Sequence, residues 1–477
     1  MSFGVVRGSF FHSSLVRGNR FQPFDDFMGW FDSKRLSGHF SVERAPLDAL
    51  DKWNFDGDQA SLGHASGKFF RVEGLRVCTN FGVTPTWDQP IINQPEIGIL
   101  GILTKVFDGV RYFLMQAKME PGNINTLQLS PTVQATKSNF SRVHEGKLPA
   151  YLDYFVGKDK AKVLIDQLQT EQGGRFLRKR NRNIVIEVSG EVALLDDFKW
   201  LTLAELRRLL SHNNFVNMDA RSVLSTIPLL DDEQLVRLRH SGLDTLLGSC
   251  GLGSLGESIV RSACEETDSY RTRDEVISWF TEQLVRYELA VQRVPLAKLE
   301  GWTVGKWEIA RSDRFFSVIG VHVEAGTREV ARWSQPLFAD LRVGLLGFVA
   351  KKINGILHLL VQAKVEPGHI DVVELSPTVS CSSYETVTMQ TTRPQFFDHF
   401  VGESKGKIHL DVLQSEEGGR FYHLQNRNMM VEVGEHQELA VPANYMWMTF
   451  AQVTELMRHS MFNIEARSLI SSLGFGT

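Results

Sequence analysis

The sequence repeats itself at an offset of about 246 residues, and this duplication restricts the chain to folds built from two similar units. Residues 116–122 (QAKMEPG) return as 362–368 (QAKVEPG), and 129–133 (LSPTV) return as 375–379. Further pairs keep the same order: 87–90 (WDQP) with 333–336 (WSQP), 171–176 (EQGGRF) with 416–421 (EEGGRF), 181–183 with 426–428 (NRN), and 220–222 with 466–468 (ARS). A period this long indicates two whole domains rather than a solenoid of short repeats.

The matched segments divide the chain into four parts. We place the first repeat at residues 39–228 and the second at 288–477. Residues 229–287 are rich in Leu, Glu and Arg, with apolar residues at helical spacing, which predicts a helical connector. Residues 1–38 form an N-terminal arm, for which a flexible segment, or one that packs across a partner subunit, is favoured over a transit peptide.

Each repeat begins with strand-like runs and ends with helical patterns, which is typical of an α+β domain. Thr202 and Thr449 stand three residues before Glu205 and Gln452, the spacing of a helix capping box. The connector contains residues 251–256 (GLGSLG), a G-x-G-x-x-G pattern. Because this pattern follows a helix-like run and not a strand, we interpret its glycines as the end of a helix rather than a dinucleotide-binding loop.

A strand predicted over residues 110–120 separates polar from apolar side chains. Its polar face carries the same three residue types in both repeats: Gln116, Lys118 and Glu120 in the first, Gln362, Lys364 and Glu366 in the second. The simple alternative is a solvent-facing strand with a Lys–Glu pair. An exposed face, however, has no reason to keep these identities while the apolar face exchanges Met119 for Val365. We therefore expect a functional surface here.

A turn should follow this strand, because proline at 121 fixes φ and glycine at 122 permits a positive φ. The next strand places Gln128 and Ser130 on one face, and Thr132 comes directly after it. If the two strands pair as a hairpin, amide, ammonium, carboxylate and hydroxyl groups converge on one surface. The second repeat offers Ser376 and Thr378 at the last two of these positions.

The first repeat is richer in cations and in groups that can move protons. Beyond its LSPTV run it carries Gln134, Lys137, Asn139, Arg142, His144 and Lys147, whereas the second repeat has lost these residues and gains Tyr384. For His144 alone, a histidine in a surface loop is the simple alternative. Residues 175–182 (RFLRKRNR) are either a solvated charge cluster or a diphosphate clamp, since guanidinium groups bind phosphate oxygens in a bidentate fork.

Composition excludes several classes of protein. The 52 Lys and Arg residues against 56 Asp and Glu leave a net charge of -4, which does not suggest a protein dedicated to nucleic acid or to an anionic membrane. The four cysteines form no C-x-x-C pair, and nothing has metal-ligand spacing, so we expect neither a zinc site nor a disulfide framework. No apolar stretch approaches the ~18 residues of a membrane span. We expect a cytoplasmic protein.

These motifs resemble those of the NDP-hexose 2,3-dehydratase family, enzymes of deoxysugar biosynthesis in antibiotic pathways. The resemblance rests on residues 116–122 and 129–136 (LSPTVQAT), on the E-x-G-G-R-F runs and on the duplication, and it covers about residues 40–477. It implies two tandem domains similar to the Nudix hydrolase fold and a homodimer. The Glu-rich Nudix box is absent from both repeats, which argues against pyrophosphate hydrolysis.

The implied substrate is dTDP-4-keto-6-deoxy-D-glucose. The implied product is the unstable dTDP-3,4-diketo-2,6-dideoxy-D-glucose, which a downstream 3-ketoreductase or aminotransferase would accept. A base removes the hydrogen on carbon 3, donors stabilise the enolate oxygen, and an acid protonates the departing carbon-2 hydroxyl. No electrons leave the substrate, so neither NAD, flavin nor metal is needed. A non-catalytic nucleotide-sugar-binding protein and a Nudix-type pyrophosphohydrolase are the alternatives.

We expect the first repeat to carry the chemistry. Glu120 or His144 is the candidate base, and Lys118 is its electrostatic partner or the acid. The candidates for binding the sugar and the diphosphate are Gln116, Gln128, Ser130, Thr132, Gln134, Lys137, Asn139, Arg142, Lys147, Arg175 and Arg182. A second pocket, vestigial or limited to binding, would contain Gln362, Lys364, Glu366, Ser376, Thr378, Tyr384, Arg420, Tyr422, His423 and Arg427.

Overall fold

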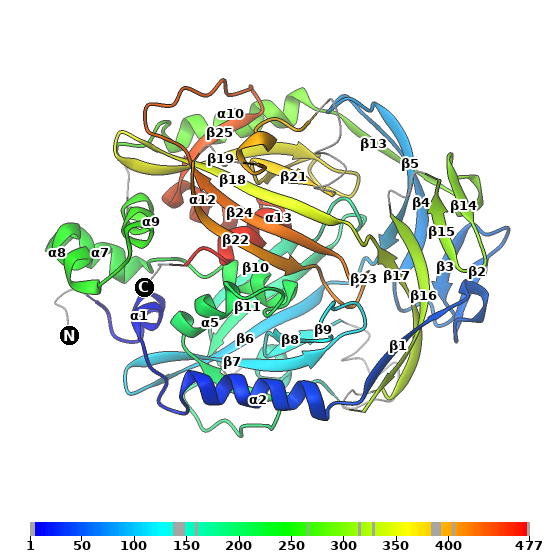
Figure 1. The fold of residues 1–477 in the computed structure, drawn as a ribbon, viewed down its shortest axis with the longest axis horizontal. Helices are drawn as coiled ribbons and strands as arrows, with labels where there is room; N and C mark the ends of the chain where they lie inside the picture. Colours follow the sequence, from blue (N-terminus) through cyan, green and yellow to red (C-terminus); the bar gives the residue numbers. More distant parts are fainter. Residues whose placement is uncertain are drawn as a thin grey trace.

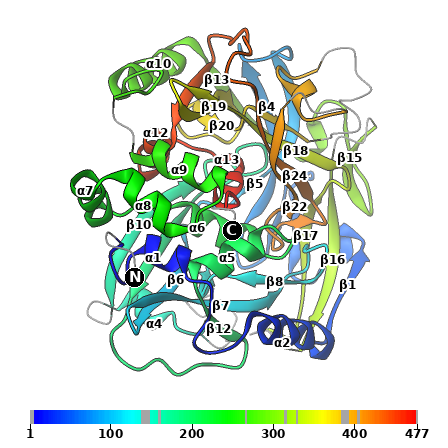
Figure 2. The same ribbon diagram turned by 60° about the vertical axis from the view of Figure 1, so that its left-hand side comes forward.

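The chain folds into two repeated mixed α/β domains that lie side by side (Figure 1). The computed structural model describes residues 5–136, 148–157, 161–264, 267–312, 316–326, 330–382, 393–402 and 406–474. Each repeat contributes one large and one smaller sheet, with helices packed against the large sheets (Figures 1 and 2). None of the helices in these ranges is long and apolar enough to cross a membrane.

The two large sheets have the same construction. The first runs β10 (Lys162–Thr170), β11 (Arg180–Glu187), β6 (Gly98–Phe107), β7 (Val110–Met119), β12 (Phe198–Leu201), with β8 (Leu127–Ser130) and β9 (Val133–Ala135) added on β7 and β6. The second runs β20 (Val373–Ser376), β19 (Ile356–Val365), β18 (Val343–Ile353), β24 (Gln425–Glu432), β22 (Lys407–Ser415), with β21 (Val379–Cys381) on β18 and β25 (Tyr445–Thr449) on β19. In each sheet one neighbouring pair is parallel, β6 with β11 and β18 with β24, while the other pairs are antiparallel.

The predicted division of the 110–120 strand into two faces is confirmed. Phe113, Met115 and Ala117 of β7 belong to one buried cluster, whereas Tyr112 and Leu114 belong to another on the opposite face. A fully buried side chain of this size contributes about 1.5–3 kcal/mol to folding. The alternation therefore fixes which face of β7 carries Gln116 and Lys118.

The predicted hairpins are also present in both repeats. Strands β7 and β8 pair antiparallel, with Gln116 opposite Ser130 and Lys118 opposite Gln128. Strands β19 and β20 pair in the same register, so that the polar residues of each hairpin are neighbours in both repeats. The register follows from the Pro-Gly turns and from the buried apolar face, because a slip of one residue would turn every side chain over.

The helices bear out the predicted signals. They are α1 (Phe10–Leu15), α2 (Phe24–Ser37), α4 (Asp153–Val156), α5 (Leu203–Leu210), α6 (Met218–Ser225), α7 (Asp232–Ser241), α8 (Leu243–Cys250), α9 (Ser254–Cys264), α10 (Arg273–Arg286), α12 (Phe450–Arg458) and α13 (Ile464–Ser471). Thr202 and Thr449 form capping boxes at the starts of α5 and α12. Gly251 ends α8 in the left-handed conformation, with a φ of 61°, as predicted, whereas Gly256 lies inside α9. The G-x-G-x-x-G run therefore links two helices and does not follow a strand.

The ARS motifs join the two repeats. Helices α6 and α13 pack together, and the guanidinium Nε of Arg221 donates to Ser468 Oγ at 2.7 Å. Arg467 reaches the opposite way, donating from Nη2 to the carbonyl oxygen of Thr170 at 2.6 Å. Both arginines are fully buried. Because buried guanidinium groups must be hydrogen-bonded, these contacts hold the domains in one relative position.

The smaller sheets exchange strands between the repeats. Strand β1 (Phe40–Ala45), from the first repeat, pairs with β16 in a sheet of second-repeat strands: β14 (Trp302–Val304), β15 (Glu308–Arg311), β16 (Ser317–Ala325), β17 (Arg332–Ala339) and β23 (Phe421–Tyr422). Strand β13 (Leu289–Val294), from the second repeat, pairs with β4 in the sheet of β2 (Trp53–Asp56), β3 (Ser61–His64), β4 (Arg71–Thr79) and β5 (Thr86–Asn93). Figure 1 shows both crossings.

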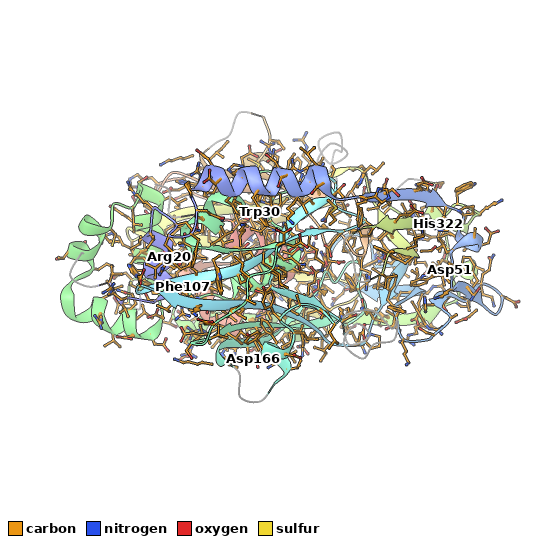
Figure 3. All side chains as sticks on the ribbon, turned by 90° about the horizontal axis from the view of Figure 1, so that it is seen from below. Arg20, Trp30, Asp51, Phe107, Asp166 and His322 are labelled. Atoms are coloured by element: carbon orange, nitrogen blue, oxygen red, sulfur yellow. The ribbon has the colours of Figure 1, made fainter. Side chains whose placement is uncertain are left out.

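The N-terminal segment packs against its own chain. Phe27 and Phe31 of α2 are fully buried in the core of the first large sheet, and Figure 3 shows α2 along the outside of that domain. Ser13 of α1 donates to the carbonyl oxygen of Arg111 at 2.6 Å, and Ser262 of α9 makes the corresponding bond to Leu357 at 2.5 Å. The segment before the first repeat thus has a structural counterpart before the second repeat.

Candidate active site

A cavity of about 280 Å³ lies between the two repeats, and both repeats line it. The first repeat contributes Trp53, His64, Phe69, Phe70, Gln94, Lys118, Glu120, Gln134, Glu171, Lys179, Asn181 and Asp219, among others. The second contributes Arg332, Trp333, Ser334, Gln335, Glu417, Gly419 and Arg420. Three residues singled out for the first repeat, Lys118, Glu120 and Gln134, therefore meet in one cavity.

Glu120 lies at the centre of this group. Its Oε1 is 3.6 Å from Lys118 Nζ and accepts a hydrogen bond of 2.9 Å from Gln134 Nε2. Gln134 is itself held by Asn217, which caps α6 and donates to Gln134 Oε1 at 3.3 Å. The second oxygen of Glu120, Oε2, is buried and accepts no hydrogen bond from the residues that the structure describes. One carboxylate oxygen is thus fixed, and the other is available to a ligand.

Further carboxyl groups surround Glu120, and burial raises their pKa values. Burial, together with Glu120 and Glu171, raises the pKa of Glu417 to about 7 against the influence of Arg420. Burial, together with the charges of Glu417, Glu171 and Glu120, raises the pKa of Asp219 well above its ordinary range. Burial also lowers the pKa of Lys179 to about 8. The cavity therefore combines carboxyl groups that can stay protonated near neutral pH with cations.

The second repeat reaches this cavity through its EEGGRF loop. Gly122, in the turn after β7, donates its amide to the carbonyl oxygen of Gly418 at 2.7 Å. A Cβ on Gly418 would lie 2.9 Å from the Cβ of Glu120 and 2.2 Å from Asn123 Oδ1, so only glycine fits at this approach. The loop is fixed from its other side by Gln335, which donates to the carbonyl oxygen of Gly419 at 2.6 Å.

Arg420 and a group of aromatic residues form the rest of the wall. The Arg420 guanidinium lies 4.3 Å from the centroid of Phe70 and donates to Gln94 Oε1 at 3.2 and 3.3 Å. The ring centroids of Trp53 and Phe70 are 4.8 Å apart. A cation beside flat apolar rings suits a ligand that combines an anionic group with a planar ring.

Arg175 and Arg420 each lie at the site of the repeat opposite to the one that the sequence analysis assigned to them. Arg175 does not line the first-repeat cavity. Its guanidinium lies 4.0 Å from the centroid of Phe316, in the second repeat, where burial lowers its pKa against the opposing charges of Asp340 and Glu366. Arg420, grouped with the second pocket, lines the first cavity instead. The grouping was wrong because each E-x-G-G-R-F loop crosses to the other repeat.

Several residues that we expected to bind the substrate instead make hydrogen bonds to other parts of the protein, or lie outside the cavity. Gln128 exchanges hydrogen bonds with Ser415 of the other repeat, and Ser130 accepts one from Asn217 at 2.8 Å. Thr132 accepts from the amide of Leu103 and donates to the carbonyl oxygen of Leu114. Gln116 does not line the cavity. Arg182 makes two hydrogen bonds to Asp166 on the exposed side of the sheet, and Arg427 makes the same pair with Asp411.

Six of the predicted site residues lie outside the described residues. They are Lys137, Asn139, Arg142, His144 and Lys147 of the first repeat and Tyr384 of the second.

The second repeat keeps a related but more closed group. Lys364 Nζ is 2.7 Å from Glu366 Oε1 and donates to Ser380 Oγ at 3.0 Å. Burial alone would raise the pKa of Glu366, but Lys364 and His369 hold it at about 2. Gln362 lies on the same strand opposite Ser376, and Thr378 is buried nearby in sequence. Tyr422 and His423, which we grouped with this pocket, follow the crossing loop instead: the amide of His423 donates to the carbonyl oxygen of Gly122 in the first repeat at 2.8 Å. The ammonium is thus closer to the carboxylate in the second repeat than in the first, while the Oε2 atoms of Glu366 and Glu120 alike accept no hydrogen bond from the described residues.

Our reading of the sequence did not single out Asp219, Glu417, Trp333 or Gln335 as cavity residues. Trp333, Gln335 and Glu417 stand inside repeated motifs, so the signal was present. Because both copies of each motif look alike, the sequence does not tell which repeat a motif serves. Among the described residues, no group of three or more His, Cys, Asp and Glu side chains is placed to hold a metal ion.

Comparison with known proteins relates this arrangement to one family. The sequence profile described as NDP-hexose 2,3-dehydratase matches residues 24–227 and 273–473, so its two blocks begin with α2 and α10. A Saccharopolyspora spinosa protein named dTDP-4-dehydro-6-deoxy-alpha-D-glucopyranose 2,3-dehydratase is 45% identical over 468 residues, which is 97% of this chain and 94% of the relative. Proteins of the same name from Amycolatopsis orientalis and Streptomyces violaceoruber are 40% and 41% identical, over 94% and 93% of this chain and 90% and 96% of their own lengths.

Proposed function

The chain belongs to the NDP-hexose 2,3-dehydratase family, and from this membership we propose that it dehydrates dTDP-4-keto-6-deoxy-D-glucose across carbons 2 and 3. The product is dTDP-3,4-diketo-2,6-dideoxy-D-glucose. The observation that carries the proposal is the identity of 40–45% with proteins named for this reaction, spread over nine tenths or more of both partners. The chain is accordingly a hydro-lyase that acts on a dTDP-sugar.

The cavity offers the groups that this reaction needs. We assign Glu120 as the base at carbon 3, because its Oε2 is available while its Oε1 is fixed by Gln134. The Lys118 ammonium, 3.6 Å from Glu120, supplies a donor for the enolate oxygen on carbon 4. We assign Arg420 and Arg332 of the cavity to the diphosphate of the substrate. The aromatic wall accommodates the thymine ring of its nucleotide.

The rest of our interpretation concerns the whole molecule. We propose tandem Nudix-like domains, supported by the mixed sheet with flanking helices in each repeat. We further propose a cytoplasmic homodimer that passes its product to a 3-ketoreductase or an aminotransferase. For the domain boundaries we propose 39–228 and 288–477, preceded by an N-terminal arm and a helical connector.

Incubation with the 4-keto sugar tests the function. Dehydration should yield a product that a 3-ketoreductase traps, or that decomposes to maltol with release of dTDP. Release of dTMP would instead indicate pyrophosphate hydrolysis. Binding of the 4-keto sugar without any conversion would indicate a non-catalytic binding protein.

A further inference from the structure

We propose that Glu417, supplied by the second repeat, is the acid that protonates the departing carbon-2 hydroxyl in the first repeat's site. This inference rests on the proposed dehydratase function and adds a catalytic residue to it. It also makes the active site a joint product of both repeats, with the base on the first and the acid on the second.

The position of Glu417 supports this role. It lines the same cavity as Glu120, and the adjacent Gly418 lies against the Cβ of Glu120 without room for a side chain. Glu417 Oε1 accepts a hydrogen bond of 2.8 Å from the amide of Gly419. Its Oε2 is buried and has no hydrogen-bond partner among the described residues. An accepting Oε1 leaves the proton on Oε2, where a ligand in the cavity can receive it.

The surroundings favour the protonated form of this carboxyl up to about neutral pH. Burial and the charges of Glu120 and Glu171 raise the pKa of Glu417 to about 7, although Arg420 opposes them. Glu120 and Glu417 are two carboxyl groups in one cavity with different surroundings, so one can act as the base while the other acts as the acid.

The proposed step balances in protons and electrons. Glu120 takes the proton from carbon 3, and the electron pair of that C–H bond passes into the enolate of the 4-ketone. As the ketone re-forms, a double bond forms between carbons 2 and 3, and the C2–O bond breaks. The departing oxygen keeps that electron pair, takes the proton of Glu417 and leaves as water. The resulting enol tautomerises to the 3,4-diketone, and a net transfer of one proton from Glu120 to Glu417 resets the site.

The counterpart of Glu417 explains why the repeats differ. In the first-repeat loop the same position is Gln172, whose loop lies against Glu366 through Gly173. An amide cannot donate a proton to a leaving hydroxyl and remain stable. The second site therefore has a Lys–Glu pair but receives no acid from the loop that crosses to it.

Hydrogen exchange in D₂O separates the two halves of the reaction. In Glu417→Gln we expect the carbon-3 hydrogen still to exchange with solvent, as seen by NMR, while elimination of water falls at least ~100-fold. Glu120→Gln should lose both exchange and elimination. Glu435→Gln, an exposed carboxylate in the second repeat, is the matched control and should retain both.

Normal elimination by Glu417→Gln, or loss of exchange and elimination together with dTDP binding intact, would overturn the role of Glu417. Should Glu417→Gln fail to fold, Glu417→Asp keeps the acid and should exchange normally while eliminating slowly; equal loss of both activities in a folded Glu417→Asp would contradict the proposal. If the wild-type enzyme does not convert the 4-keto sugar at all, the proposed function itself fails, so the two failures are distinct.

Discussion

At the scale of single residues, the proton on Glu417 sets the expected pH dependence. The acid form must be present for elimination, and a pKa of about 7 means that this form is lost as the pH rises above neutrality. We predict that kcat/KM falls about tenfold per pH unit well above pH 7, whereas the carbon-3 exchange lacks this decline. Initial rates measured from pH 5.5 to 9 for both reactions would check this, and parallel profiles would contradict it.

The two Lys–Glu pairs should contribute unequally to turnover. Lys118→Ala with Glu120→Gln should reduce turnover by ~100- to 10,000-fold, because it removes the base and its ammonium partner. Lys364→Ala with Glu366→Gln should leave most of the turnover, since both members of the buried 2.7 Å pair are removed together. Steady-state rates and thermal melting of both double variants test this. If the second pair abolishes turnover in a folded protein and the first spares it, the catalytic repeat is reversed.

At the scale of elements, the contact between the Pro-Gly turn and the crossing loop is the tightest joint of the site. Gly418→Ala should cost about 1–3 kcal/mol of stability and displace Glu417 from the cavity, because the added Cβ meets Glu120 and Asn123. We expect turnover to fall at least ~10-fold, which corresponds to a loss of about 1.4 kcal/mol of transition-state stabilisation. Gly190→Ala is the control, since nothing lies within 4 Å of its added Cβ. Similar melting temperatures and rates for the two variants would contradict this account.

The elements that could be predicted are those determined by neighbours in sequence. The faces of β7, the hairpins and the capping boxes of Thr202 and Thr449 all follow from local spacing, and the structure confirms them. The crossing of Arg175 and Arg420, and the exchange of β1 and β13, could not be predicted. Two alike repeats offer each loop and strand two equivalent partners, and only tertiary packing chooses between them.

At the scale of the whole molecule, the exchanged strands and the buried arginines make the repeats mutually dependent. We predict that residues 1–229 and 230–477, expressed separately, are insoluble or unfolded, because each would lack a strand of its smaller sheet and would expose Arg221 or Arg467. Co-expression of the two pieces should restore a folded complex. Circular dichroism and size-exclusion chromatography would test this, and a stable, cooperatively melting single piece would contradict it.

The reaction should proceed without an added cofactor. The elimination is redox-neutral, and the carboxyl groups and cations of the cavity supply the proton transfers and the charge stabilisation. We predict full activity after treatment with EDTA and without added nicotinamide. Loss of turnover on chelation, restored by magnesium, would contradict this prediction.

The crossing of the loops affects how the two sites can come to differ in sequence. If the two repeats were separate, identical chains forming a symmetric dimer, any change in the E-x-G-G-R-F loop would appear in both sites at once. Joining them in one chain removes that constraint, since Glu417 and Gln172 can now differ. The second-repeat loop brings Glu417 and Arg420 to the first repeat's cavity, which the first repeat's own loop also lines through Glu171. A single substitution in one copy can therefore silence one site and leave the other intact, and duplication within one chain allows two similar halves to specialise.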